Sequence, residues 1–124
     1  MIRGIGVDIV DIDRIRRLVE AEGERFLTKV FTETEIQYCN GKARRHQHFA
    51  ARFAAKEAVS KALATGWAGD FRWKDVEVTN DPTGQPRVSL HGQLREHIGS
   101  AHIRISLSHA DNHVVAMAVI EEIP

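Results

Sequence analysis

Residues 52–63 read RFAAKEAVSKAL, a helical segment that is apolar around almost its whole circumference. A helix of this kind is normally buried, so we take it as the element around which the chain is organised. At about 100° per residue, Glu57 and Lys61 lie among small apolar residues, whereas Arg52 and Lys56 occupy a separate edge. Buried charges are costly unless they are paired or bound to a ligand. The simplest explanation is an i,i+4 ion pair between Glu57 and Lys61, worth roughly 0.2–0.5 kcal/mol on an exposed face.

The composition fits one globular domain spanning residues 1–124, with 43% hydrophobic and 27% charged residues. The formal net charge is zero, so no overall field favours nucleic acid or an anionic membrane as a partner. The charge is uneven, because residues 42–61 contain six basic residues and one acid, with His46 and His48 in addition. Either a solvated basic face or a nearby anionic ligand would account for this excess.

Cysteine usage and the absence of targeting patterns indicate the compartment. Cys39 is the only cysteine, so no internal disulfide can form and a reducing environment fits. The first residues lack the apolar core and small-residue cleavage site of a signal peptide. The longest apolar run, residues 114–120, is too short to span a bilayer. We therefore expect a soluble cytoplasmic protein that has no membrane partner.

Residues 2–10 alternate with period two, which predicts a strand. Branched apolar residues face one side of this strand, and Gly4, Gly6 and Asp8 face the other. Glycines at alternate strand positions often mean that another backbone or a ligand comes close. Two interpretations follow. Asp8 could be an exposed carboxylate whose glycine neighbours serve packing alone, or it could be a functional carboxylate beside an open surface.

The remaining elements follow from periodicity, caps and turn residues, including a capping box formed by Thr32 and Glu35. The last strand is apolar on both faces, which indicates a subunit interface. The sequence thus predicts an α+β fold in which one long buried helix and several short helices pack on a small, mostly antiparallel sheet. The expected elements are short helices at 12–22, 26–31, 32–38 and 92–99, a long helix at 46–64 closed by Thr65-Gly66, a loop at 67–70, and hairpins pairing 76–79 with 86–90 and 103–109 with 114–121.

Asp8, Glu57 and the surrounding cations form a recognisable chemical set. Mg²⁺ prefers oxygen ligands, keeps several waters, and typically takes one or two carboxylates together with substrate phosphate oxygens. Lys and Arg side chains from the basic segment would neutralise the remaining phosphate charge. The residues therefore favour a Mg²⁺-dependent enzyme that acts on a phosphate or diphosphate, provided that Asp8 and Glu57 meet in space.

Three motifs resemble those of a known family. The stretches GIGVDIV at residues 4–10, RFAAKEA at 52–58 with Lys61, and SLSH at 106–109 resemble the bacterial holo-(acyl-carrier-protein) synthases. These are the small, single-module 4′-phosphopantetheinyl transferases. The order, spacing and overall length match, and the likeness runs over residues 2–121. The resemblance implies transfer of 4′-phosphopantetheine from coenzyme A to a serine of apo-acyl carrier protein, with release of adenosine 3′,5′-bisphosphate.

The resemblance also implies roles for particular residues near the diphosphate. Asp8 and Glu57 would hold Mg²⁺ against the diphosphate of coenzyme A, and Lys61 would stabilise charge on the leaving group. Either Glu57 or a metal-bound water could accept the serine proton. The alanines of the helix would leave room for the substrate.

At the nucleotide end of coenzyme A, the resemblance assigns the adenosine 3′-phosphate to Arg44, Arg52 and His109. One departure from the family pattern lies in the first hairpin. Gly84-Gln85-Pro86 stands where relatives more often have Gly-Lys-Pro, which removes one cation from this part of the chain. The reaction class is unaffected by this change.

Further expectations concern protein partners. Acyl carrier proteins are acidic, so the basic face of the first helix, with Arg14 and Arg17, is the implied docking surface. The family commonly forms trimers with the active site between subunits, which fits the doubly apolar last strand. Two other functions would use parts of the same chemistry: a non-catalytic module that binds a nucleotide or an acidic protein, and a Mg²⁺-dependent diphosphate hydrolase. The first gives no reason for Asp8 beside two glycines, and the second needs no docking face.

Overall fold

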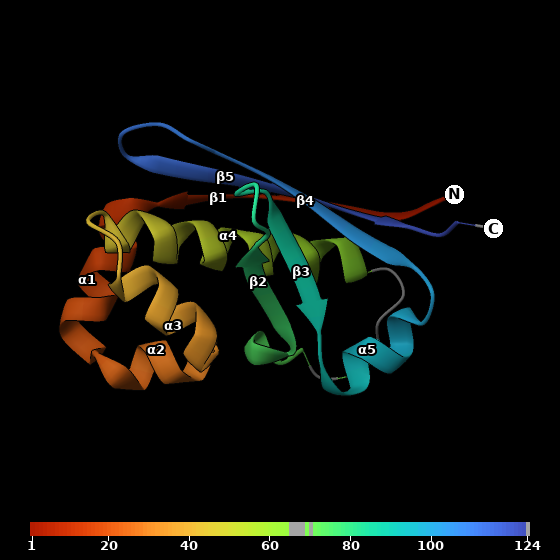
Figure 1. Ribbon diagram of the computed structural model, residues 1–124, viewed down its shortest axis with the longest axis horizontal. Helices are drawn as coiled ribbons and strands as arrows, with labels where there is room; N and C mark the ends of the chain where they lie inside the picture. The colour runs from red at the N-terminus through yellow and green to blue at the C-terminus, as the bar shows by residue number, and fades with distance from the viewer. Residues whose placement is uncertain (65–68, 70, 124) are drawn as a thin grey trace.

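The computed structural model of this chain describes residues 1–64, 69 and 71–123. Strands β1, β5 and β4 form a three-stranded antiparallel sheet in that order, and β2 and β3 form a separate antiparallel hairpin. Helix α4 runs along one face of the sheet, with α1, α2 and α3 gathered at one end (Figure 1). The predicted α+β class is confirmed. The elements are β1 (Ile2–Asp11), α1 (Ile12–Glu22), α2 (Glu24–Val30), α3 (Glu33–Asn40), α4 (Arg45–Leu63), the 3₁₀ turn η1 (Trp73–Asp75), β2 (Val76–Asn80), β3 (Pro86–Leu90), α5 (Gly92–Ile98), β4 (His102–His109) and β5 (His113–Glu121).

Local capping signals set the ends of the short helices. Asp11 caps α1, because its side chain accepts a hydrogen bond from the backbone N–H of Asp13 at 2.9 Å. Gly23 ends that helix with a φ of 56°, a conformation that favours glycine. Thr32 and Glu35 form the predicted capping box at the start of α3. The predicted stop of the long helix at Thr65-Gly66, and most of the predicted loop at 67–70, lie outside the described residues.

Strand β1 packs directly on the backbone of α4. A Cβ atom added at Gly4 would lie 2.0 Å from the carbonyl oxygen of Ala62, and one added at Gly6 would lie 1.9 Å from that of Ala58. The two glycines therefore admit another backbone, as their spacing in the strand suggested. The expectation that the helix alanines leave room for substrate is wrong for Ala58 and Ala62, because the strand fills the space above them.

An ion pair buried beneath α4 joins this helix to α3 and to the first hairpin. Lys56 is 0% exposed, and its Nζ lies 2.9 Å from Oε1 of Glu35. The ammonium group also donates to the carbonyl oxygens of Trp73, at 3.0 Å, and Val76. The second oxygen of Glu35 accepts the backbone N–H of Val78 at 2.8 Å. Burial lowers the pKa of Lys56, and the charge of Glu35 acts in the opposite direction.

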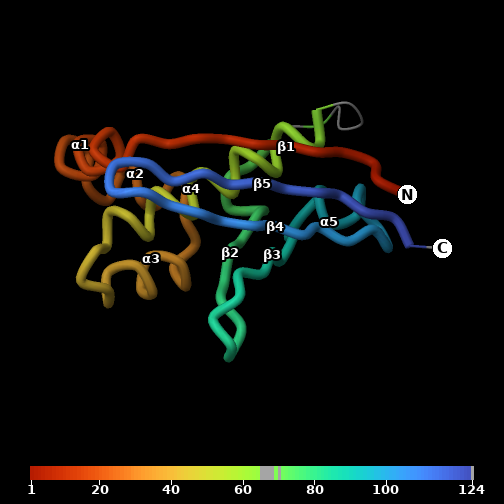
Figure 2. The backbone as a smooth tube through the Cα atoms, turned by 90° about the horizontal axis from the view of Figure 1, so that it is seen from above, coloured from red at the N-terminus to blue at the C-terminus, as the bar shows by residue number. Residues whose placement is uncertain are grey.

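The sheet turns one apolar face toward α4 and another away from it. Figure 2 shows β1, β5 and β4 side by side as the sheet is seen from above. Alternate residues of β5 are buried against α4, whereas their neighbours on the outer face are exposed. Five large apolar side chains on this outer face are 37–64% exposed: Ile5, Val7, Ile9, Val115 and Met117. In the described part of the chain, no helix is long and apolar enough to cross a membrane.

Candidate active site

Asp8 and Lys61 meet where β1 crosses α4. Oδ1 of Asp8 lies 3.1 Å from Nζ of Lys61, which also donates a hydrogen bond of 3.0 Å to the carbonyl oxygen of Val7. Among the described residues, no ion pair links Lys61 to Glu57. The simple i,i+4 pair within the helix is therefore wrong, because the close packing of the glycine strand places the Asp8 carboxylate beside Lys61.

Glu57 lies close enough to Asp8 and Lys61 for their charges to affect its carboxyl group. Its pKa is raised, first by burial and then by the negative charge of Asp8, while Lys61 and Arg14 act in the opposite direction. The structure thus brings together all three residues predicted for the diphosphate end: Asp8, Glu57 and Lys61. It also adds Arg14, whose charge reaches Glu57 from α1.

The donor set fits a small, hard cation. The two carboxylates of Asp8 and Glu57 repel each other, which adds to the effect of burial on the pKa of Glu57, and a divalent cation between them would remove that repulsion. The described residues contain no cluster of three or more His, Cys, Asp or Glu side chains able to hold a metal. Two carboxylates would leave further coordination positions for water and phosphate oxygens, which is the arrangement that Mg²⁺ prefers.

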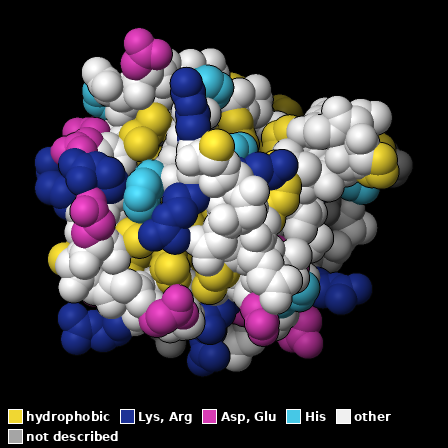
Figure 3. All heavy atoms as spheres, turned by 60° about the vertical axis from the view of Figure 1, so that its left-hand side comes forward, with side chains coloured by type: hydrophobic (Ala, Val, Ile, Leu, Met, Phe, Trp, Pro, Cys, Tyr) yellow, Lys and Arg dark blue, Asp and Glu magenta, His cyan; other side chains and the backbone are white. Residues whose placement is uncertain are grey.

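The basic face of α1 is only partly free. Arg14 is exposed, and it takes part in none of the ion pairs formed by the described residues. Arg17 pairs with Asp13, which also pairs with Arg16. Figure 3 shows Lys and Arg side chains over this end of the molecule, the densest group lying next to Asp and Glu side chains. Of the two arginines predicted to meet a partner protein, Arg14 is the one whose charge acts on Glu57.

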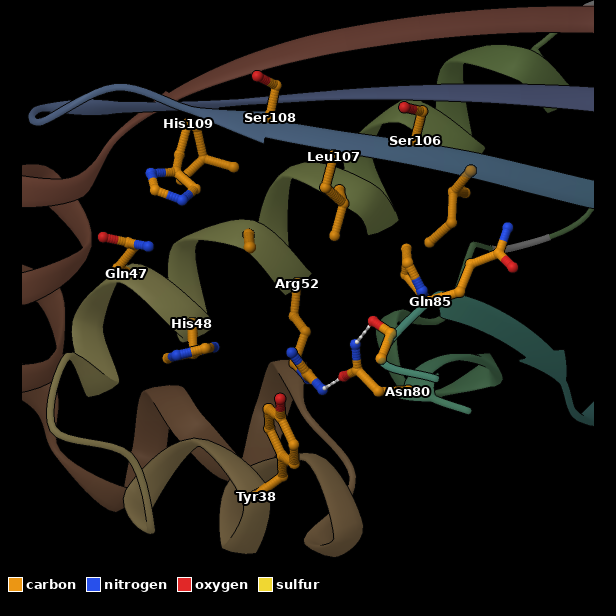
Figure 4. Close-up of a pocket in the computed structure, with 15 residues that line it drawn as sticks. Tyr38, Gln47, His48, Arg52, Asn80, Gln85, Ser106, Leu107, Ser108 and His109 are labelled. Carbon is orange, nitrogen blue, oxygen red and sulfur yellow. Dashed lines mark hydrogen bonds between the residues drawn. The ribbon is translucent and has the colours of Figure 1, made fainter. Parts of the chain in front are cut away.

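A pocket of about 400 Å³ opens between α3, α4, the turn of the first hairpin and β4. Arg52 and His109, both predicted to meet a nucleotide phosphate, line it together (Figure 4). Arg44 does not line this pocket; it lies with Arg16 and Arg45 in a different surface depression. The pocket is lined by Tyr38, Gln47, His48, Ala51, Arg52, Asn80, Gly84, Gln85, Pro86, Ile105, Ser106, Leu107, Ser108, His109 and Val114.

Arg52 is buried in the wall of this pocket. It is 3% exposed, its Nη2 donates to Oδ1 of Asn80 at 2.9 Å, and its Cζ lies 4.2 Å from the centre of the Tyr38 ring. Its Nε is buried and has no hydrogen-bond partner. The pKa of nearby His48 is lowered by burial and then by the charges of Arg52 and Lys42. These groups make the pocket electropositive, so an anionic ligand would be stabilised there.

Sequence reasoning missed three residues of this pocket: Tyr38, His48 and Asn80. Tyr38 ends the helix predicted at 32–38, and Asn80 directly follows the strand predicted at 76–79; neither position marks a residue as part of a pocket. Only His48 carried a usable signal, because it falls within the basic segment at 42–61. Gln85, which stands where relatives more often have lysine, also lines the pocket. The pocket therefore lacks the cation that a lysine at this position would supply.

Comparison of the sequence with protein families gives a match over residues 4–118 to the family model described as the 4′-phosphopantetheinyl transferase superfamily. The chain is 47% identical to the holo-[acyl-carrier-protein] synthase of Geotalea daltonii over 125 residues, which cover 98% of this chain and 100% of that protein. It is 42% identical to the holo-[acyl-carrier-protein] synthase of Koribacter versatilis, with the same coverage.

Solved structures resemble the whole fold. The holo-[acyl-carrier-protein] synthase of Neisseria meningitidis superposes with a TM-score of 0.87 at 32% identity, covering 98% of this chain and 100% of that one. A holo-(acyl-carrier-protein) synthase of Bacillus anthracis in complex with CoA (3′,5′-ADP) gives a TM-score of 0.81 at 34% identity, covering 98% and 97%. The Helicobacter pylori enzyme in complex with coenzyme A gives 0.83 at 30% identity, covering 94% and 99%.

Proposed function

The chain belongs to the 4′-phosphopantetheinyl transferase superfamily, and from this premise we propose that it is a holo-[acyl-carrier-protein] synthase. It transfers 4′-phosphopantetheine from coenzyme A to a serine of apo-acyl carrier protein. The serine oxygen forms a bond to the pantetheine-bearing phosphorus, and the bond from that phosphorus to the bridging oxygen breaks. Adenosine 3′,5′-bisphosphate leaves with the bond's electron pair. The observation that carries the proposal is the meeting of Asp8, Glu57 and Lys61 beside an electropositive pocket.

Asp8 and Glu57 are the residues that would hold Mg²⁺. When bound, the ion would neutralise charge on the diphosphate oxygens as the bond to the leaving group breaks. Lys61 adds a second positive charge at the same place, because Asp8 and the carbonyl of Val7 hold its ammonium group there. The serine proton passes to Glu57 or to a water.

We assign the nucleotide half of coenzyme A to the pocket that Arg52 and His109 line. A buried guanidinium is a strong and permanent positive charge, suited to a phosphate monoester. Arg44 is exposed outside this pocket, so we place it at the outer edge of the nucleotide site. The coenzyme A complexes of the similar proteins support this use of the fold.

The carrier protein would dock on α1. Arg14 is free on the surface, and its charge reaches Glu57, so an acidic partner held there would stand close to the reacting groups. Arg17 would have to exchange its pair with Asp13 for an acid of the partner.

The exposed outer face of the sheet supports self-association, and the resemblance implies that the assembly is a homotrimer. Apolar side chains from β1 and β5, such as Ile5 and Met117, make a contiguous surface that association would remove from water. A cytoplasmic location remains a prediction from the sequence.

One assay tests the proposed function. The protein is incubated with coenzyme A, Mg²⁺ and an apo-acyl carrier protein, and the carrier is weighed by mass spectrometry. We expect the carrier mass to rise by one phosphopantetheine group, and a carrier whose acceptor serine is alanine to stay unmodified. Release of adenosine 3′,5′-bisphosphate without any gain in carrier mass would indicate the diphosphate hydrolase instead. Binding without either product would indicate a non-catalytic module.

A further inference from the structure

Arg52 presents an unusual charge balance for a buried residue. None of the ion pairs formed by the described residues includes it, although it is 3% exposed. Its hydrogen-bond partner, Asn80, is neutral and leaves the full positive charge in place. A buried charge without a counter-charge is costly, so the site is incomplete without an anion. The free protein carries this cost in the pocket that we assign to the nucleotide.

Two neighbours fix the position of the Arg52 guanidinium. The ring of Tyr38 covers one of its faces at 4.2 Å, in a cation–π contact. Asn80 holds one end of the guanidinium, and the Nδ2 of Asn80 in turn donates to the carbonyl oxygen of Gly84 at 2.9 Å. Figure 4 shows Arg52 reaching from α4 with the Tyr38 ring beside it and the Asn80 amide at its tip. The guanidinium is therefore held from α3 on one side and from the hairpin turn on the other.

The same neighbours keep the charge available to a ligand. Nζ of Lys42 also lies 4.8 Å from the centre of the Tyr38 ring, so this ring has two cations beside it, Lys42 and Arg52, and the ring of His48 packs on it edge-on with centres 5.7 Å apart. An aspartate at position 80 would have nearly the shape of Asn80, but it would neutralise Arg52 internally. The amide thus orients the guanidinium without consuming its charge.

We propose that Tyr38 and Asn80 are positioning residues that hold Arg52 for the 3′-phosphate of the donor, and that they thereby make the site select coenzyme A over 3′-dephospho-coenzyme A. This inference rests on the proposed function. Coenzyme A and 3′-dephospho-coenzyme A differ by one phosphate monoester. The preference for coenzyme A therefore measures how much the oriented Arg52 guanidinium, which has no counter-charge in the protein, contributes to donor binding. Neither residue takes part in the chemistry at Asp8, Glu57 and Lys61.

The test compares both donors in the carrier-modification assay with Asn80→Asp, Tyr38→Leu and Tyr38→Phe. We expect Asn80→Asp to raise KM for coenzyme A roughly tenfold and Tyr38→Leu about fivefold, as charge-assisted and cation–π contacts of this kind predict. KM for the dephospho donor should change by less than about twofold, and kcat at saturating coenzyme A should stay close to that of the wild type. Tyr38→Phe keeps the aromatic ring, so this variant should retain the wild-type preference for coenzyme A over the dephospho donor.

The remote substitution Asn112→Asp is the matched control, because it makes the same chemical change away from this pocket. Thermal melts of every variant report folding. Equal losses toward both donors, or a loss in Tyr38→Phe as large as in Tyr38→Leu, would overturn the inference by showing a merely structural or hydroxyl-based role.

Calorimetric titration with adenosine 3′,5′-bisphosphate and with adenosine 5′-monophosphate separates this inference from the proposed function. We expect the wild type to prefer the bisphosphate and Asn80→Asp to lose most of that preference. If the wild type modifies no carrier but shows this pattern, the transferase proposal fails and the inference about Arg52 stands. If the wild type modifies the carrier and binds both nucleotides equally, the inference fails alone.

Discussion

Substitution of Lys56 by methionine should destabilise the fold severely, although the lysine touches no predicted substrate. The change removes an ammonium group that pairs with Glu35 and donates to two backbone carbonyl oxygens, all in a region closed to water. Methionine nearly matches the volume, so the loss is electrostatic and not a cavity. Removing one partner of a buried pair typically costs roughly 3–5 kcal/mol, since the remaining charge is left without a counter-charge.

Urea unfolding followed by circular dichroism measures this cost. With a slope of about 2 kcal/mol/M, a loss of 3–5 kcal/mol lowers the midpoint by roughly 2 M. Lys74→Met is the matched control, because Lys74 is exposed and takes part in no ion pair among the described residues; its midpoint should stay within about 0.3 M of the wild type. The double variant with Glu35→Gln should be more stable than the sum of the two single losses predicts.

Two results would refute this reasoning. A midpoint for Lys56→Met within about 0.5 M of the wild type would mean that the buried pair barely stabilises the fold. Strict additivity with Glu35→Gln would mean that the two charges act independently. A normal midpoint combined with a large fall in kcat would instead give Lys56 a role in the reaction.

Three further predictions concern the site. Glu57→Gln should abolish most turnover, yet it should raise the melting temperature of the metal-free protein near pH 7. Folding raises the pKa of Glu57 above its ordinary value of 4.5, so the carboxyl group contributes its full stability below that value and loses it as pH rises through the folded pKa. The difference in melting temperature between Glu57→Gln and the wild type should therefore vanish in acid. A variant that is less stable than the wild type at neutral pH would contradict this. Arg14→Glu should raise KM for carrier protein and leave KM for coenzyme A unchanged, as steady-state kinetics can check. The pKa of His48, followed by NMR, should rise when adenosine 3′,5′-bisphosphate binds, because the anion offsets the charges that lower it; an unchanged titration would place the nucleotide elsewhere.

Local rules accounted for much of the fold. The capping box at Thr32, the helix stop at Gly23 and the turn before Pro86 depend on neighbouring residues, so their sequence patterns are sufficient. The approach of β1 to α4 was also foreseeable in kind, because glycines at positions 4 and 6 leave space that some backbone or ligand must occupy.

Contacts between distant segments were not foreseeable from one sequence. The pair of Lys56 with Glu35 joins two helices, and the helical pattern shows only that Lys56 lies on an edge. The site at Arg52 likewise depends on Tyr38 and Asn80 arriving from α3 and from the hairpin. Asp8 and Glu57 were grouped first as two carboxylates suited to Mg²⁺ and then by the family resemblance, and the structure supplies the physical reason for their approach in the crossing of β1 over α4.

That crossing also determines how wide the carboxylate site can be. Gly4 and Gly6 rest on the carbonyl oxygens of Ala62 and Ala58, so the gap between strand and helix is set by main-chain atoms that no rotamer change can adjust. The distance between the backbone of β1, which carries Asp8, and that of α4, which carries Glu57, is therefore fixed. One methyl group at Gly6 would widen it, and discrimination between a small cation such as Mg²⁺ and a larger one such as Ca²⁺ would then depend on a residue that touches neither ion.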